Sequence, residues 1–186
     1  MKRTLIALAL VAALPAAASA AELDYNYVEA GRKFVDLQGG NDADGYQIGG
    51  SVALGDQFHL FGSYANLSPD VHVFSDDADL WRLGLGWNRS ISDSSDLVVR
   101  ANYGELNTSF GNADAWEAEV GLRSALTDRF ETYVALGYSD GEGDGVAFGK
   151  LGAQYKFNRT WGIVADATIA ADDGANEYFI GPRLSF

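Results

Sequence analysis

Two histidines are the side chains best suited to acid–base chemistry in a chain that contains no cysteine. His59 shares its place in an alternating pattern with Ser63, and His72 lies two residues after Asp70. A histidine-dependent hydrolase needs the imidazole beside a serine, or beside an aspartate that orients it. Neither histidine stands in a motif of such an enzyme, so we expect both to be structural and predict no catalytic residue. A lipid- or peptide-hydrolysing enzyme is the alternative, and it depends on these two histidines.

The acidic segment at 139–145 (SDGEGDG) is the best match to a metal-binding motif. Its carboxylates are spaced like the first ligands of a calcium loop, but the twelfth position would be Leu151 in place of a bidentate glutamate. That difference excludes an EF-hand. We therefore expect a solvated hairpin tip, no metal site and no cofactor. Weak binding of divalent cations is the alternative, through the acidic loop residues Asp76, Asp77, Asp79, Asp140, Asp144, Asp172 and Asp173.

A set of ten charged residues, five of each sign, alternates with large apolar residues along the chain. The set comprises Glu29, Arg82, Arg100, Glu117, Glu119, Arg123, Glu131, Lys150, Asp166 and Arg183. Successive side chains of a β-strand point to opposite faces, so these charges share one face and the apolar residues share the other. An arginine that faces hydrocarbon at mid-depth costs about 2–4 kcal/mol, and a fully apolar face is not tolerated in water. We therefore predict a membrane barrel with lipid outside and a paired ion network inside.

Ten segments with a period of two must position this network. They cover residues 23–35, 45–54, 57–66, 80–88, 96–105, 115–125, 130–138, 149–157, 161–169 and 177–186. The fourth is the clearest, because Trp81, Leu83, Leu85 and Trp87 alternate with polar or small residues. The predicted fold is all-β, a single closed antiparallel transmembrane barrel of ten strands. Eight strands is the alternative, if the first and third segments are not both spans.

The breaks between these segments alternate between short and long, which is typical of periplasmic turns and extracellular loops. Short breaks are expected at 55–56, 90–95, 127–129 and 158–160, and longer ones at 36–44, 67–79, 106–114, 139–145 and 171–176. Tyrosine and tryptophan recur near the ends of the segments, as aromatic girdles at the two membrane interfaces require. The predicted interface residues are Tyr46, Tyr64, Trp81, Trp87, Tyr103, Trp116, Tyr138, Tyr155, Trp161, Tyr178 and Phe186.

The last segment, EYFIGPRLSF, keeps its alternation up to Phe186. Such an ending indicates a strand that is paired on both sides, as in a closed barrel. Pro182 has no N–H, so we expect a bulge or a missing ladder bond there.

An alternating strand that ends in phenylalanine resembles the sorting and assembly signature of bacterial outer-membrane barrels. Together with the alternating segments, it makes the chain similar to the small outer-membrane β-barrel superfamily with OmpA-type and OmpX-type domains. The segment YNYVEAG at 25–31 also resembles a narrower family of small proteobacterial barrels, some of them named as quorum factors. The resemblance implies a location in the Gram-negative outer membrane, contact with its lipid, and recognition of the last strand by the barrel-assembly machinery.

The first twenty residues have the features of a secretory signal peptide. Lys2 and Arg3 precede an apolar run, which is followed by Ala18-Ser19-Ala20. We expect cleavage after Ala20, leaving a barrel domain at 21–186. Without Lys2 and Arg3, the 13 basic residues fall to 11 against 26 acidic ones, a net charge of −15. That balance argues against binding to nucleic acid.

The predicted function is a structural or surface-interacting role through acidic extracellular loops, with a lumen largely plugged by ion pairs. The predicted contact patch is 67–79, where Val71, Val73 and Phe74 would be exposed. The alternative is a narrow porin-like channel for small solutes, because ten strands enclose more space than the eight that side chains just fill. The sequence identifies no ligand, receptor or oligomeric state.

Overall fold

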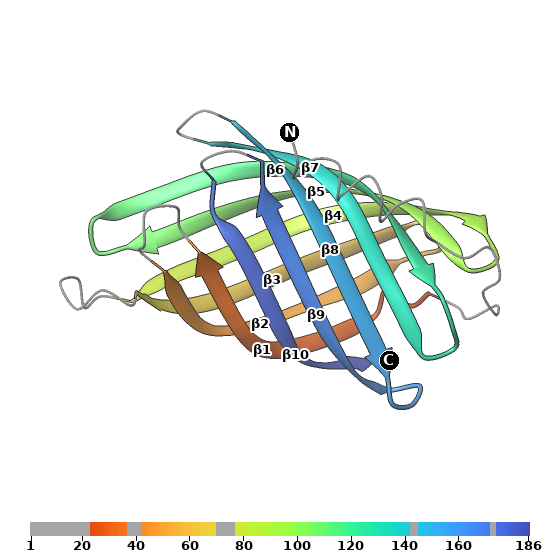
Figure 1. Cartoon of the computed structure of the whole chain (residues 1–186). Coiled ribbons are helices and arrows are strands. Elements are labelled where there is room, and N and C mark those ends of the chain that lie inside the picture. The colour runs from red at the N-terminus through yellow and green to blue at the C-terminus, as the bar shows by residue number, and fades with distance from the viewer. Residues whose placement is uncertain (1–22, 37–41, 70–76, 142–144, 172–173) are drawn as a thin grey trace.

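The computed structural model describes residues 23–36, 42–69, 77–141, 145–171 and 174–186. Each strand in this part of the chain pairs antiparallel with the next, and the last pairs with the first, so the sheet closes into a barrel (Figure 1). The strands are β1 (Tyr27–Asp36), β2 (Ala43–Leu54), β3 (Phe58–Pro69), β4 (Ala78–Ser92), β5 (Ser95–Thr108), β6 (Gly111–Ala125), β7 (Phe130–Gly141), β8 (Val146–Lys156), β9 (Trp161–Ala170) and β10 (Asn176–Ser185). The predicted ten-stranded all-β barrel is therefore confirmed, and the eight-stranded alternative is wrong.

Within the described ranges, no helix has the length and apolar character needed to cross a membrane. The predicted signal peptide at 1–20 lies outside the described residues. The end of the barrel that holds residue 23, Phe186 and the short turns at 55–57, 93–94, 126–129 and 157–160 is called the turn end below. The opposite end, where the other connections lie, is called the loop end.

Several strands are longer than the sequence pattern predicts. β4 continues past Trp87 to Ser92, and β5 and β6 run through the predicted loop at 106–114. The long connection predicted there is wrong, because only residues 109–110 separate the two strands. Thr108 Oγ1 donates to the Gly111 carbonyl at 2.8 Å and accepts from the Phe110 N–H at 3.2 Å, and Gly111 has a φ of 144° that favours glycine. This hairpin projects at the left of Figure 1, in green.

The two faces of the barrel wall have opposite polarity. Every strand has exposed, outward-facing large apolar side chains, whereas the buried set includes Lys33, Glu119, Arg123 and Glu131. A water-soluble barrel has the reverse arrangement. Because no soluble monomer tolerates an apolar surface that surrounds it completely, the outer face requires lipid.

The ladder between β1 and β10 is interrupted at its middle. Pairs run from Tyr27↔Ser185 to Glu29↔Arg183 and resume at Arg32↔Ile180 in the same register. Between them, Ala30 and Gly31 have no ladder partner in β10, and both strands are described in full. Pro182, which lies opposite Ala30 in this register, cannot donate to a ladder. The predicted missing ladder bond at Pro182 is confirmed, and the constant register shows that no bulge accompanies it.

We expect Gly181→Ala to destabilise the barrel at this seam. A methyl group at Gly181 would overlap the Ala30 carbonyl oxygen of β1, and a backbone atom cannot rotate away as a side chain can. Overpacking of this kind costs about 1–3 kcal/mol. The matched control is Gly149→Ala, whose methyl group would meet nothing nearer than Leu136 Cδ2 at 3.9 Å. Denaturant titration in lipid vesicles measures both variants, and equal free energies of unfolding would contradict the close approach at the seam.

Candidate functional site in the barrel lumen

In the ranges that the structure describes, the inner face of the barrel carries seven basic and seven acidic side chains, which form three networks. Successive side chains of a strand point to opposite faces of the sheet, and all of these charged side chains occupy the positions that point into the lumen. The loop-end network contains Lys33, Arg82, Glu117 and Glu177; the central network contains Glu29, Arg100, Glu119, Lys150, Asp166 and Arg183; the turn-end network contains Asp96, Arg123, Glu131 and Lys156. Each network has equal numbers of the two signs, so each is neutral when all its members are ionised.

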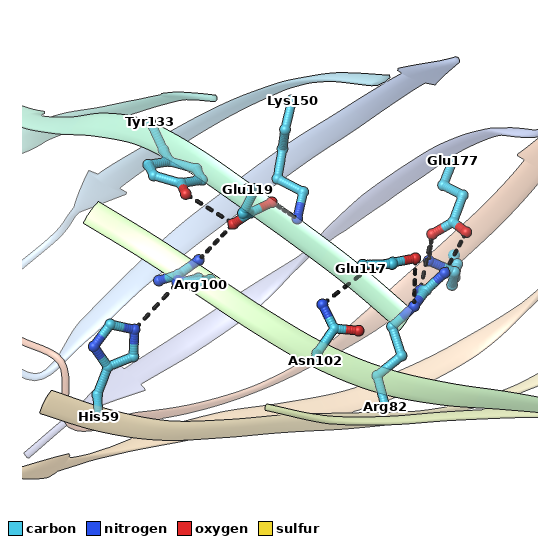
Figure 2. Close-up of polar contacts among 10 residues, drawn as sticks. His59, Arg82, Arg100, Asn102, Glu117, Glu119, Tyr133, Lys150 and Glu177 are labelled. Atoms are coloured by element: carbon cyan, nitrogen blue, oxygen red, sulfur yellow. Dashed lines mark hydrogen bonds and ion pairs between the residues drawn. The ribbon is translucent and has the colours of Figure 1, made fainter. Parts of the chain in front are cut away.

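Glu177 on β10 is the centre of the loop-end network (Figure 2). Its carboxylate accepts from Lys33 Nζ at 2.6 Å and from two nitrogens of Arg82 at 2.6 and 3.0 Å. Arg82 Nε lies 3.5 Å from Glu117 Oε1, and Asn102 Nδ2 donates to the other Glu117 oxygen at 3.1 Å. A bidentate arginine–carboxylate pair has a fixed geometry, so this network ties β4 on one wall to β10 on the opposite one.

An apolar cluster lies beyond this network at the loop end. Val35, Ala65 and Leu67 are buried there. The partly buried residues that pack against them are Ala43, Ala78, Leu80 and Ala175. The sequence analysis did not anticipate this cluster, because it placed Leu67 in an exposed patch. Within the described residues, Leu67 and Ala78 of that patch both belong to this cluster inside the barrel.

The central network surrounds Glu119 (Figure 2). Lys150 Nζ and the Tyr133 hydroxyl donate to its two oxygens at 2.7 and 2.8 Å, and Arg100 Nη1 lies 3.7 Å away. The Arg100 guanidinium also lies over the rings of Phe61 and Tyr133, at 5.2 and 5.0 Å from their centroids. These contacts hold the cation across the middle of the lumen.

His59 is fully buried beside this network. Arg100 Nε donates to its Nε2 at 3.1 Å, and its Nδ1 lies 3.3 Å from Asn88 Oδ1. Both ring nitrogens are therefore engaged by an arginine and an amide rather than by Ser63, so the pair considered in the sequence analysis is not assembled. His72 and Asp70 lie outside the described residues.

The remaining members of the central network lie on β1, β9 and β10. Arg183 donates twice to Glu29 Oε2, at 2.6 and 2.8 Å, and once to Gln154 Oε1 at 3.0 Å, with its guanidinium 4.0 Å from the Tyr27 ring centroid. Asp166 makes no direct ion pair in the described part of the chain. Its carboxylate lies over Gly152, on the wall of a cavity of about 190 Å³ that we call the chamber. A cavity of this volume has room for water molecules.

The turn-end network joins β5, β6, β7 and β8 to the segment before β1. Glu131 binds both Arg123, at 2.6 Å, and Lys156. Asp96 accepts from the hydroxyls of Ser90 and Tyr25, each at 2.8 Å. Burial raises the pKa of the Tyr25 phenol well above its ordinary value, so the hydroxyl keeps the proton that it donates.

A second cavity opens outside this network, at the turn end. This vestibule has a volume of about 1410 Å³ and is lined by Tyr25 and by residues of the short turns. No residue lines both the chamber and the vestibule. Arg123 and Glu131 of the turn-end network line the chamber, whereas Asp96 and Lys156 line the vestibule, so this network lies between the two cavities.

All ten residues of the predicted network face the lumen, and nine of them make an ion pair there; Asp166 is the exception. The sequence analysis missed four members, Lys33, Asp96, Lys156 and Glu177. The signal that could have identified them is the alternation itself, because each has the same parity as the lumen-facing residues of its strand. Arg32, by contrast, faces outward, where it pairs with Asp44 and lies 4.6 Å from the Tyr46 ring centroid.

The predicted interface aromatics lie on the outer face in two belts. The loop-end belt contains Tyr46, Tyr64, Trp81, Tyr103, Trp116, Tyr138 and Tyr178, and the turn-end belt contains Trp87, Tyr155, Trp161 and Phe186. Within the first belt the ring centroids of Trp81 and Tyr103 are 5.5 Å apart, and those of Tyr103 and Trp116 are 5.0 Å apart. Two aromatic belts that bound an apolar band are the outer surface of a membrane barrel.

Comparison with known families also indicates a membrane barrel. The family described as the outer membrane protein beta-barrel domain matches residues 5–180. The chain belongs to this family. This outer-membrane barrel is therefore in contact with membrane lipid, and its resemblance to the small outer-membrane barrels is confirmed. The narrower resemblance of residues 25–31 and recognition by the assembly machinery stay predictions.

Several solved structures are similar to this outer-membrane barrel at low sequence identity. The translocator domain of autotransporter NalP from Neisseria meningitidis is 11% identical, with a TM-score of 0.52, over 100% of this chain and 95% of that one. The KdgM porin is 11% identical with a TM-score of 0.46, over 88% and 99% of the two chains. The N-terminal β-barrel domain of Pseudomonas aeruginosa OprF is 16% identical with a TM-score of 0.41, over 88% and 100%. No curated protein matches the chain.

The acidic residues considered for divalent cations are only partly described. Asp76, Asp144, Asp172 and Asp173 lie outside the described residues. In the ranges that the structure covers, no group of three or more histidine, aspartate or glutamate side chains is placed to hold a metal ion. Asp79 is instead engaged by the Tyr64 hydroxyl at 2.6 Å and by Asn66 Nδ2 at 3.0 Å.

Proposed function

We propose that this outer-membrane barrel is a non-conducting scaffold that presents its loop end to the cell exterior. Its turn end then faces the periplasm, as short turns do in this class of barrel. Export through a signal peptide at 1–20, cleaved after Ala20, belongs to the same proposal. So does recognition of β10 by the barrel-assembly machinery.

The observation that carries this proposal is the closure of the lumen by neutral, directly bonded networks. A water-filled pore leaves charged side chains solvated and free to interact with passing solutes, whereas here Glu177, Glu119 and Glu131 each bind two cations. An ion that entered would have to displace a buried pair and leave its partner uncompensated, which is strongly unfavourable. The apolar cluster at Val35, Ala65 and Leu67 adds a second barrier at the loop end.

The charge of the outer rim supports a surface role for the loop end. Among the described residues of that rim, the outward-facing carboxylates are Asp36, Asp44, Asp79, Glu105, Asp114 and Asp140, and Arg32 is the one outward-facing base. An acidic rim favours partners that carry positive charge. The predicted contact residues Val71, Val73 and Phe74 lie outside the described residues, so the contact patch at 67–79 stays a prediction.

Planar-bilayer recording of the refolded protein tests the scaffold function. We expect no steady single-channel openings, because Glu177, Glu119 and Glu131 hold cations directly inside the lumen. A porin refolded and inserted in the same way is the positive control for insertion. Steady openings of the unmodified protein would instead select the narrow channel for small solutes, a second candidate that the chamber and the vestibule favour.

An enzymatic function finds little support in the lumen. His59 has an arginine and an amide as its partners, and neither can act as a nucleophile. We therefore propose that the barrel is not a hydrolase.

A further inference from the structure

The two closures of the lumen are built differently. Every charged residue of the loop-end network lies on a strand and is fixed by the barrel ladder. The turn-end closure also depends on Tyr25, which precedes β1 and lies outside the ladder. The segment is tied to the rim at Asn26, whose side-chain oxygen accepts from the Ala53 N–H at 2.9 Å and whose carbonyl accepts from the Phe186 N–H at 3.1 Å. Residues before Asn26 are therefore the part of this closure that can move without breaking a strand.

Tyr25 occupies the boundary between the two cavities. Its side chain enters the lumen and is only 6% exposed, although it also lines the vestibule. The ring stacks on His59 with centroids 4.6 Å apart, and the Arg123 guanidinium lies 4.7 Å from the ring centroid on the chamber side. Arg123 Nη1 also donates to the Asp24 carbonyl at 2.8 Å, which holds the backbone of the segment against the lumen.

Each partner of Tyr25 has a second partner on the barrel wall. Asp96 keeps the Ser90 hydroxyl, and Arg123 keeps Glu131. His59 keeps both of its nitrogen contacts. Withdrawal of Tyr25 therefore leaves each of these three groups with a partner on the wall and breaks no ion pair. Removal of one member of a buried ion pair is far more unfavourable, because it leaves the other charge uncompensated. Loss of Glu177 at the other end would, by contrast, leave Lys33 without its ion-pair partner and Arg82 with only Glu117, at 3.5 Å.

We propose that residues 23–25 form a gate at the turn end of the lumen and that the Tyr25 side chain is its latch. When the segment withdraws, the chamber joins the vestibule, while the loop-end network and the apolar cluster stay closed. The open state exposes the chamber to one side of the membrane only, the periplasmic side in the orientation proposed above. This inference rests on the proposed sealed barrel and adds a movable closure to it.

Accessibility of a single cysteine in the chamber tests the gate. The chain has no cysteine of its own, so Ser63→Cys gives a unique thiol on the chamber wall and Ser92→Cys gives one in the vestibule. The probe is a positively charged, membrane-impermeant methanethiosulfonate, applied to the barrel refolded in lipid vesicles. We expect slow labelling of Ser63→Cys and rapid labelling of Ser92→Cys in the otherwise unmodified chain.

Substitution of Tyr25 should change only the labelling of the chamber. We expect Tyr25→Ala to accelerate labelling of Ser63→Cys at least tenfold and to leave Ser92→Cys unchanged. Tyr25→Phe, which keeps the ring contacts and loses the bond to Asp96, should give a smaller acceleration. Tyr46→Ala is the matched control, because it removes the same side chain from the outer face.

Either of two results would overturn the gate. One is an unchanged rate for Ser63→Cys in the Tyr25→Ala and Tyr25→Phe backgrounds, with folding verified by circular dichroism. The other is labelling of Ser63→Cys as fast as that of Ser92→Cys in the unmodified chain. Bilayer recording separates the two proposals, since steady openings of the unmodified protein contradict the sealed scaffold, whereas a silent protein with an unchanged labelling rate contradicts the gate alone.

Discussion

Glu177→Ala will lower the free energy of unfolding by about 3–5 kcal/mol, which is the effect expected when one member of a buried ion pair is removed. The substitution leaves Lys33 and Arg82 facing each other without their shared carboxylate. Glu117 lies 3.5 Å from Arg82 Nε but has no contact with Lys33, so it compensates only part of the lost charge. Urea titration in lipid vesicles, followed by tryptophan fluorescence, measures the loss.

The matched control for Glu177→Ala is Asp44→Ala, which breaks the ion pair of Asp44 with Arg32 on the outer rim. The two side chains of that pair are 36% and 41% exposed, so water replaces the lost contact. A pair of this kind contributes about 0.2–1 kcal/mol. Similar losses for the two variants would mean that the loop-end network is hydrated as well, and the lumen would then not be sealed at that end.

The alternation of polar and apolar residues was sufficient to predict the fold. A segment such as 80–88 has the same alternation in a soluble sheet, so the decisive feature was chemical: arginine and glutamate occupied the face that a soluble barrel fills with apolar groups. The structure confirms the ten strands and their closure. It also explains Pro182, which lies where β1 and β10 leave two positions unpaired.

The pairing inside the lumen could not be predicted from the same pattern. Alternation assigns a side chain to a face, but partners on facing walls depend on the stagger between strands, and Arg82 and Glu177 are 95 residues apart. Asp166 was predicted to take part in the ion network, but it lines the chamber and makes no ion pair with the described residues. Alternation in the segment predicted at 23–35 turns Tyr25 inward, but β1 begins only at Tyr27. The contacts of Tyr25 with β3, β5 and β6 could not be predicted.

The connection at 106–114 was predicted wrongly because a few local residues determine it. The residues at 106–114 are polar enough to indicate a loop, yet they continue two strands. The hydrogen bonds of Thr108 and the positive φ of Gly111 form the turn, and both are features of a few residues that composition does not report. Because these strands extend past the loop-end belt, their outer ends stand in water and tolerate polar side chains.

Leu85→Arg will lower the free energy of unfolding in a lipid bilayer by about 2–4 kcal/mol, because Leu85 lies between the two aromatic belts on the outer face of β4. Its ladder neighbours are Leu60 and Ala101, so the new guanidinium would have no partner within the apolar band. The control is Ile91→Arg on the same strand and the same face, beyond Trp87 at the turn-end belt. Near the interface the same substitution costs about 0–1 kcal/mol.

The comparison is informative because the two side chains differ little in exposure, 49% for Leu85 and 57% for Ile91. A protein surrounded by water would tolerate arginine equally at both positions, since both side chains already point into the solvent. Only a hydrocarbon layer between the belts would make arginine more destabilising at Leu85 than at Ile91. Unfolding titrations of the two variants in the same vesicles therefore test the surroundings of the barrel directly, and equal, small losses would mean that its outer face does not contact lipid at the level of Leu85.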